Sequence, residues 1–317
     1  MLVNLSRKEW VEAIERLRPL HLNEREYVID ALMATFKVSA TYFIYSDKEK
    51  PVISFIALGN KKKIFNPIHF FYSAFWVDES LSDPKYAACV SHFLKELTAK
   101  FNNVEIRLPL SINDVRPFLW NNFTVKNFYT YVKDLQEESY HPSTAKNIRK
   151  TANKGYECKR ENLNEHNLAL NMQLLTALQF FPKTIVGIEA FLKRVSSKDE
   201  ISCYSCYLNG ELIASNIMFL DFQNKIAYTV LLNKLADEIK DDVHSLLHHF
   251  FFRDLKERGF AEVDLLGGDM QSIAAFKARM NASLKPHFVV SYSKKKSSVK
   301  GYLQKVKYIA KRLISKF

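Results

Sequence analysis

The stretch from Val263 to Pro286, VDLLGGDMQSIAAFKARMNASLKP, holds the only Gly-Gly pair in a chain with 8 glycines in 317 residues. An apolar run precedes the pair, and a helical pattern that contains Phe276 and Lys277 follows it. Consecutive glycines relax the steric limits on φ and ψ and let another backbone or a ligand approach closely. The pattern predicts a strand, a bend at Gly267 and Gly268, and then a helix.

The residues on both sides of this stretch predict further helices and strands in an order that partly repeats. Each half of the chain shows helices flanking one mixed sheet, which predicts the α/β class (α+β mixed sheets) with two domains. Helices are expected at 6–17, 84–101, 143–154, 164–180, 187–195, 242–258 and 271–281. Strands are expected on both sides of a turn at 47–51, within 67–77, at 104–110 and 124–132, three times within 201–233, and at 261–266 and 287–293.

A polar stretch at 134–142, DLQEESYHP, ends in proline and marks the domain boundary. We expect an N-terminal domain at 1–135 and a C-terminal domain at 136–299. Residues 300–317 predict a basic amphipathic helix, because apolar residues recur on one face with lysines around them. Such a helix fits an anionic membrane surface, and it equally fits the protein's own core.

Composition and motifs exclude several classes of protein. No run of 18 or more apolar residues and no secretory signal pattern occur, so the expected location is cytoplasmic. The chain has no GxGxxG and no GxxxxGK[ST], which argues against a dinucleotide-binding site and against a P-loop. The formal net charge is +12, and residues 270–317 carry twelve basic and no acidic residues, so the excess is local. Such a surface attracts phosphates, nucleic acid or an anionic membrane face, or is simply solvated.

Two spacings typical of metal sites have simpler interpretations. Cys203 and Cys206 are three apart in an expected strand, so they point to opposite faces and predict buried thiols. His244 and His248 share a helical face but lack the glutamate of HExxH, and we expect an interfacial or partly exposed pair. No set of metal ligands is complete.

Cations gather on one face of the helix expected at 143–154. Lys146, Arg149 and Lys150 lie at helical spacing with no acidic residue between them. Such a cluster is unfavourable unless an anion relieves it, so we expect either a phosphate-binding face or a solvated one.

The Gly-Gly stretch carries its own candidate residues. Asp264 and Asp269 bracket the glycines at the end of a strand, and Lys277 follows on the next helix. A turn with an aspartate N-cap accounts for most of this pattern without any function. A cation beside a strand end would also stabilise an oxyanion or a phosphate.

Three segments in order resemble motifs of the Fem-type and BioF2-like acyltransferases, a branch of the GNAT superfamily built from two tandem GNAT-like domains. The segments are RPFLWNNFTVKNFYTYVKDL, NIRKTANKGY and VDLLGGDMQSIAAFKARMN, within residues 114–281. The family pattern is a basic helix containing arginine, a strand that ends in an Asp and Gly-rich turn, and a Phe-Lys pair. Here these positions are Arg149 with Lys150, Asp264 with Gly267 and Gly268, and Phe276 with Lys277.

The resemblance implies transfer of an acyl or aminoacyl group onto an amine of a sugar or a cell-envelope or surface-polysaccharide precursor. Acyl-CoA or aminoacyl-tRNA would be the donor. Lys277 would provide electrostatic stabilisation, Asp264 or Asp269 would accept the amine proton, and Arg149 would hold substrate phosphate with Lys146 and Lys150. Expected partners are a phosphate-bearing sugar or lipid-linked acceptor, tRNA, and the inner membrane face through residues 300–317.

The chain departs from the family pattern in two places. The family often continues FKxxFG, whereas this chain has FKARMN. The residues before the helix at 242, LADEIKDD, carry aspartates where a GNAT pyrophosphate loop offers glycine amides, and these would repel a pyrophosphate. An aminoacyl-tRNA donor or an unusual donor pose therefore gains support. A non-catalytic RNA-binding protein and a pseudo-enzyme with the GNAT fold are the alternative functions.

Overall fold

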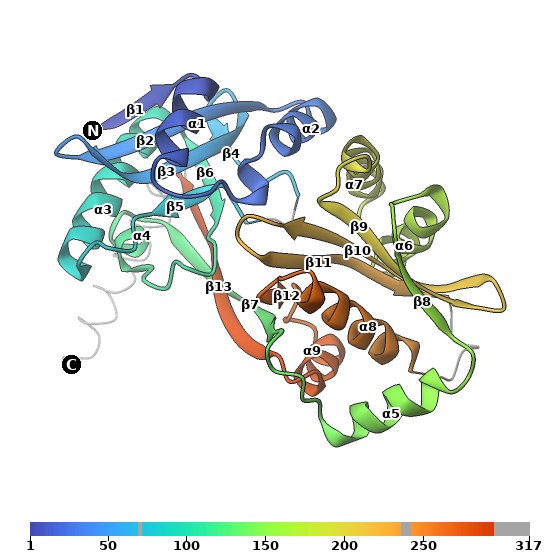
Figure 1. Ribbon diagram of the computed structural model, residues 1–317. Helices are drawn as coiled ribbons and strands as arrows, with labels where there is room; N and C mark the ends of the chain where they lie inside the picture. Colours follow the sequence, from blue (N-terminus) through green and yellow to red (C-terminus); the bar gives the residue numbers. More distant parts are fainter. Residues whose placement is uncertain (69–71, 236–241, 295–317) are drawn as a thin grey trace, which may run out of the picture. The chain divides into compact units, whose positions relative to one another are not determined.

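The computed structural model describes residues 1–68, 72–235 and 242–294 (Figure 1). The chain divides into two compact units. Among the described residues, the first holds 1–17, 38–127 and 287–294, and the second holds 18–37 and 128–286. The expected ranges 1–135 and 136–299 were each one continuous stretch, whereas both units are assembled from separate stretches. The helix expected at 300–317 lies outside the described residues.

The first unit is a mixed sheet in the order β1-β2-β3-β4-β6-β13, with β5 paired to β3. Only β4 and β6 pair in parallel. The strands are β1 (Leu2–Leu5), β2 (Ser39–Asp47), β3 (Lys50–Asn60), β4 (Lys63–Ile64), β5 (Phe75–Val77), β6 (Asn103–Arg107) and β13 (Ser283–Ser293). Its helices are α1 (Arg7–Glu15), α3 (Asp83–Lys100) and α4 (Arg116–Trp120).

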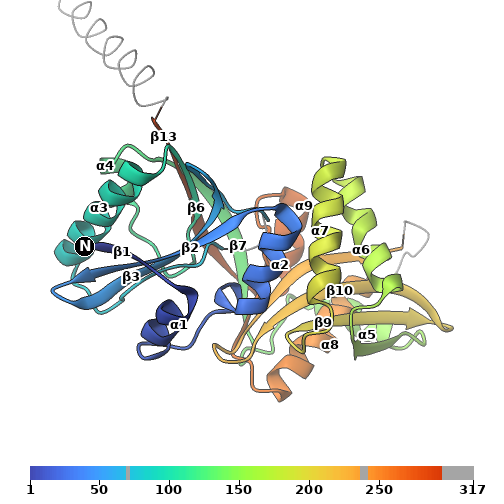
Figure 2. The ribbon, with the colours of Figure 1, turned by 90° about the horizontal axis from the view of Figure 1, so that it is seen from above.

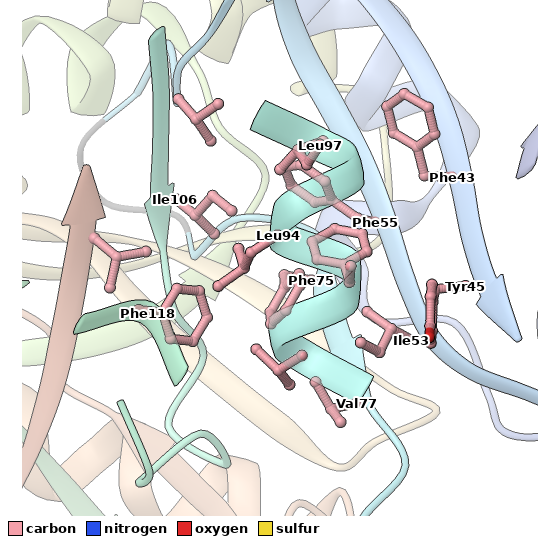
Figure 3. Close-up of a cluster of buried hydrophobic side chains, with 14 of the residues drawn as sticks. Phe43, Tyr45, Ile53, Phe55, Phe75, Val77, Leu94, Leu97, Ile106 and Phe118 are labelled. Carbon is pink, nitrogen blue, oxygen red and sulfur yellow. The ribbon is translucent and has the colours of Figure 1, made fainter. Parts of the chain in front are cut away.

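Aromatic side chains form the centre of the first unit's core (Figure 3). The ring of Phe55 on β3 packs edge-on against Phe75 at 5.7 Å and against Phe93 of α3 at 6.1 Å. Edge-to-face pairs of this kind add to the free energy gained by burying the rings. The helix expected at 84–101 is α3, which covers one face of the sheet and supplies Phe93 to this core.

The second unit is a mixed sheet in the order β7-β12-β11-β10-β9-β8, in which only β11 and β12 are parallel. The strands are β7 (Thr124–Asp134), β8 (Glu157–Glu161), β9 (Ile201–Leu208), β10 (Glu211–Asp221), β11 (Ile226–Lys234) and β12 (Glu262–Asp264). Helices α2 (Glu26–Phe36), α6 (Glu165–Ala177) and α7 (Pro182–Val195) lie on one face, and α5 (Pro142–Ala152), α8 (Val243–Glu257) and α9 (Gln271–Arg279) on the other (Figures 1 and 2). Mixed sheets flanked by helices confirm the expected α/β class.

Residues 18–37 explain why the second unit is not continuous in sequence. The short helix η1 (Leu22–Glu24) brings Glu24 into a two-point ion pair with Arg18, at 2.6 and 2.7 Å. The backbone N–H of Leu22 donates to the carboxylate of Asp221 on β10 at 2.9 Å. Helix α2 then packs on α7, where a side chain at Gly187 would collide with Phe36. No sequence expectation covered this segment.

Removing the charge of Glu24 should destabilise the second unit. The Glu24 side chain is 1% exposed and Arg18 is 12% exposed, so Glu24→Gln leaves a nearly buried guanidinium without its counterion. Breaking a buried pair in this way costs about 3–5 kcal/mol. Urea denaturation followed by circular dichroism should show this loss. The matched control is Glu12→Gln, which breaks an exposed pair with Lys8 and should cost under about 1 kcal/mol. Equal midpoints for the two variants would contradict the argument.

Candidate functional site

The parallel strands β11 and β12 separate soon after they pair. Their register covers only Ile226–Tyr228 on β11 and Glu262–Asp264 on β12, and β11 then continues to Lys234. Within the described residues, that last part of β11 has no strand partner on its β12 side. Ligands of open α/β sheets bind beyond the carboxyl ends of the strands, so this divergence is the candidate site.

The Gly-Gly bend continues β12 across this divergence. Leu266 and Gly267 both take positive φ, 49° and 50°, which turns the chain. Gly268 then donates its N–H to the carbonyl of Tyr129 on β7 at 2.8 Å. A Cβ at Gly268 would lie 2.8 Å from the Tyr129 carbonyl oxygen, so only glycine allows this approach. The glycines therefore serve a close contact between backbones.

Lys277 closes the bend from α9. Its Nζ donates to the carbonyls of Leu265 at 2.8 Å and Gly267 at 2.9 Å, and also to that of Leu266. The residue is 9% exposed, and burial lowers the pKa of Lys277 to about 8 while Asp264 and Asp269 oppose that shift. An ammonium has three N–H bonds, and here carbonyl oxygens accept all three. The ammonium thus binds backbone carbonyls of its own chain, whereas the sequence suggested that it would face an oxyanion or a phosphate.

The two carboxylates beside the bend lie in different surroundings. Asp264 is 2% exposed and accepts hydrogen bonds from Thr130 Oγ1 at 2.5 Å and from the N–H of Leu266 at 2.9 Å. Asp269 is exposed and accepts from the N–H of Tyr129 at 3.0 Å. Asp264 is therefore fixed inside the sheet, whereas Asp269 is accessible to a substrate.

The two helices that begin near the divergence differ at their N-termini. Asp242 caps α8, accepting from the N–H of Ser245 at 3.2 Å and from its hydroxyl at 2.7 Å. Helix α9 has Met270 at its N-cap and no side-chain cap. Within the described chain, no acceptor is in hydrogen-bond range of the Gly267 N–H. Free N–H groups at a helix start attract anions, so α9 offers the better anion site.

Phe276 packs inside the unit rather than lining an open surface. The centroid of its ring lies 5.0 Å from that of the His248 imidazole and 6.1 Å from that of His244. Burial lowers the pKa of both imidazoles, to about 3 for His248 and about 4 for His244. The expectation was an interfacial or partly exposed pair: His244 is partly exposed, whereas His248 is 1% exposed at the interface of α8 with Phe276 of α9.

Helix α5 carries the expected cations on its outer face. Lys146, Arg149 and Lys150 are exposed, and no carboxylate of the described residues forms an ion pair with them. Two hydrogen bonds place the helix: Asn147 donates to Asp242 at 3.0 Å, and the N–H of His141 donates to the carbonyl of Arg279 at 3.0 Å. The cations are thus on a helix that joins the start of α8 to the end of α9.

The remaining candidates do not form a metal centre. Cys203 and Cys206 are both 0% exposed on β9, which confirms the expectation of buried thiols. Across the parts of the chain that the structure describes, no three His, Cys, Asp or Glu side chains gather as metal ligands. Among those parts, no helix is both long and apolar enough to span a bilayer.

Sequence reasoning missed the partners that β7 supplies. Tyr129 and Thr130 hold Gly268, Asp269 and Asp264 through the contacts above, yet they lie more than 130 residues earlier in the chain. The sequence of β7, TVKNFYTYVKD, gives no local signal that identifies the partners of these two residues.

Comparisons with known proteins identify the fold that carries this site. Residues 144–278 match the family model described as an acetyltransferase (GNAT) domain. The fold is similar to the crystal structure of FemX, with a TM-score of 0.64, 10% identity, and coverage of 91% of this chain and 96% of that one. No curated protein sequence matches the chain.

Two further solved structures share the fold. One is the C-terminal domain of a putative lysylphosphatidylglycerol synthetase from Agrobacterium fabrum, with a TM-score of 0.54, 11% identity and coverage of 93% and 95%. The other is a tandem GNAT protein from the clavulanic acid biosynthesis pathway, with a TM-score of 0.52, 9% identity and coverage of 93% and 98%. The expected Fem-like, tandem GNAT fold is confirmed.

Alanine should be tolerated unequally at the two glycines. Gly268→Ala places Cβ against the backbone of Tyr129, which cannot move without breaking the strand contact. Gly267→Ala meets only the flexible Lys277 Nζ at 3.8 Å and adds about 1 kcal/mol for its positive φ. Urea denaturation should rank Gly268→Ala as clearly less stable than Gly267→Ala. The reverse order would show that the backbone approach is not what selects glycine.

The lowered pKa of Lys277 predicts how stability changes with pH. From about pH 8 to the pKa of the unfolded chain near 10.5, the folded protein releases a proton that the unfolded chain retains. The free energy of unfolding must therefore rise with pH across this window. Comparing the protein with Lys277→Met from pH 7 to 10.5 isolates the contribution, because other groups titrate equally in both. If the difference in the free energy of unfolding between the two proteins stays constant with pH, Lys277 keeps an ordinary pKa.

Proposed function

Since the chain carries a GNAT domain within a Fem-like fold, we propose that it is an N-acyltransferase acting on an amine of a sugar or other cell-envelope or surface-polysaccharide precursor. The observation that carries the proposal is the divergence of β11 and β12 inside the matched domain, beside an exposed carboxylate and an uncapped helix start. The name of the Agrobacterium neighbour, a lysylphosphatidylglycerol synthetase, supports an aminoacyl group and an envelope acceptor.

In the proposed reaction, the acceptor amine attacks the acyl carbon beside the bend. A new N–C bond forms and the bond from the acyl carbon to the donor's oxygen or sulfur breaks. The proton that the amine loses passes through the base to the leaving oxygen or sulfur, which departs as a hydroxyl or thiol. Asp269 is the base that we assign, because it is exposed and lies at the start of α9. The Gly267 N–H and the first N–H groups of α9 would stabilise the oxyanion.

The proposed role of Lys277 is narrower than the sequence suggested. For the ammonium to meet an oxyanion directly, it would have to give up one of three carbonyl contacts. We therefore propose that Lys277 acts mainly as a positioning residue, whose hydrogen bonds hold residues 265–267 in place. Asp264 has a similar role, because it fixes the N–H of Leu266.

The donor is proposed to be acyl-CoA or an aminoacyl-tRNA, and the geometry at α8 favours the second. Asp242 already accepts from the first turn of α8, and its negative charge opposes a pyrophosphate at that position. The phosphate of a sugar or lipid-linked acceptor would bind Lys146, Arg149 and Lys150. The cytoplasmic location, and contact with an anionic membrane through residues 300–317, are further parts of the proposal.

Asp269→Asn should remove most of the acyl transfer without unfolding the protein. The test incubates the protein with acyl-CoA or charged tRNA and nucleotide-sugar amines and detects the amide product by mass spectrometry. Loss of a general base lowers kcat by about 10²–10⁴-fold. Exposure of Asp269 predicts a small effect on stability, so circular dichroism should match the parent protein. Full turnover by Asp269→Asn would refute the base assignment.

Neutralising α5 should weaken acceptor binding selectively. Arg149→Gln with Lys150→Gln should raise KM for phosphate-bearing acceptors, leave kcat nearly constant, and reduce the salt dependence of KM. The matched control is Lys183→Gln on α7, which is exposed on the other face of the sheet and should change nothing. Equal effects of the α5 and α7 variants would reject α5 as the phosphate site. Salt-dependent tRNA binding without any acyl transfer would favour the RNA-binding alternative.

A further inference from the structure

A cavity of about 350 Å³ lies between the end of α5, the start of β8 and the outer side of α8. This volume is at the lower end of the range for small-molecule sites, which suits a ligand of one ring. The lining residues are Ala152, Tyr156, Cys158, Leu246, His249, Phe250, Arg253, Asp254 and Glu257. Figure 1 shows the three elements that enclose it.

The cavity is separate from the bend. Helix α8 turns His249 and Arg253 toward the cavity, whereas His244 and His248 on the same helix contact Phe276 of α9. A ligand in the cavity would therefore lie on a different side of α8 from the proposed reaction centre. Nothing in the acyl-transfer proposal uses this space.

The lining combines aromatic walls with hydrogen-bonding groups. Tyr156 and Phe250 supply apolar ring surface. His249 takes part in a hydrogen bond with the hydroxyl of Tyr140 through Nδ1 at 3.1 Å, which leaves Nε2 for a ligand. Burial, followed by the charge of Arg253, lowers the pKa of His249, so the imidazole is neutral at pH 7. Ring surface beside several polar groups is the combination that a sugar requires.

Two carboxylates of the lining, Asp254 and Glu257, are the groups that would bind a cation. Asp254 is held by the Tyr204 hydroxyl at 2.6 Å and by Arg258 at 3.4 Å. Glu257 is less constrained, because its contact with Arg253 is 3.8 Å long and both side chains are about two-thirds exposed. Glu257 is thus the carboxylate that is available to an amine.

We propose that this cavity binds a sugar ring that carries a free amine, with the amine on Glu257 and the ring against Tyr156 and Phe250. The hydroxyl groups would pair with Arg253, Asp254 and His249. The site goes beyond the proposed function, because it would hold a ring at a distance from the reacting amine. A longer aminosugar acceptor would gain affinity from it without any change in the chemistry.

Cys158 allows a direct test without any measurement of acyl transfer. It lines the cavity and is partly exposed, whereas Cys89, Cys203 and Cys206 are at most 5% exposed. N-ethylmaleimide should therefore modify Cys158 first, and mass spectrometry of peptides gives its rate. Glucosamine should slow this modification. The matched probes are N-acetylglucosamine and glucose, which lack the free amine, and cyclohexylamine, which lacks the hydroxyl groups; each should protect clearly less.

The decisive variant is Glu257→Gln, which keeps the shape and removes the charge. The variant loses the charge-assisted hydrogen bond to the amine, so the glucosamine concentration needed for protection should rise about 5-fold. The control is Glu138→Gln, an exposed carboxylate that pairs with Lys256 and does not line the cavity. In this variant, glucosamine should protect Cys158 as strongly as it does in the parent protein.

Three results would overturn the proposal: no protection by glucosamine, equal protection by N-acetylglucosamine, or protection that survives Glu257→Gln. Protection by cyclohexylamine equal to that by glucosamine would assign the cavity to simple amines instead of sugars. Because none of these readouts involves a donor, a failed acyl-transfer assay leaves this test intact.

Discussion

The contact between the Lys277 ammonium and three consecutive carbonyls determines the geometry of the second unit's site. Carbonyl groups of neighbouring residues normally point in alternate directions along a strand, which keeps their dipoles apart. At Leu266 and Gly267 the chain turns through positive φ, and the carbonyl oxygens of Leu265, Leu266 and Gly267 converge on one nitrogen. Without N–H donors between them, these oxygens would repel one another. The lysine therefore makes a bend possible that the backbone alone would disfavour.

That bend determines where the neighbouring groups lie. Among the described residues, it leaves β11 without a strand partner on the β12 side after Tyr228, it brings Gly268 against β7, and it directs the chain into α9 with an uncapped first turn. It also separates Asp264, which is enclosed by Thr130 and Leu266, from Asp269, which is exposed. Two aspartates five residues apart thus have different functions available to them. Their surroundings, and not their residue type, decide which one can exchange a proton with a substrate.

The sequence predicted local elements well and long-range contacts poorly. Apolar spacing and capping residues predicted the helices α3, α5, α8 and α9 and the hairpin strands β9, β10 and β11, because those signals are local. The segment 18–37 was missed because its place depends on Asp221, some two hundred residues later. The same holds for the site. The Gly-Gly pair and Lys277 stand out in the sequence, but the sequence does not show whether the lysine side chain faces a substrate. Only the folded chain shows that its Nζ donates to the carbonyls of residues 265–267.

Helix α8 connects the parts of the site that the sequence treated separately. Its capped start carries the Asp242 carboxylate that holds α5 through Asn147, so the exposed cations of α5 are fixed relative to α8. One side of the helix packs histidines against α9, and the other side lines the cavity. A substrate that extended along α5 would therefore meet positive charge outside and the carboxylate of Glu257 at the cavity. A molecule with a free amine and a phosphate on different parts of its length matches that order, and a simple anion does not.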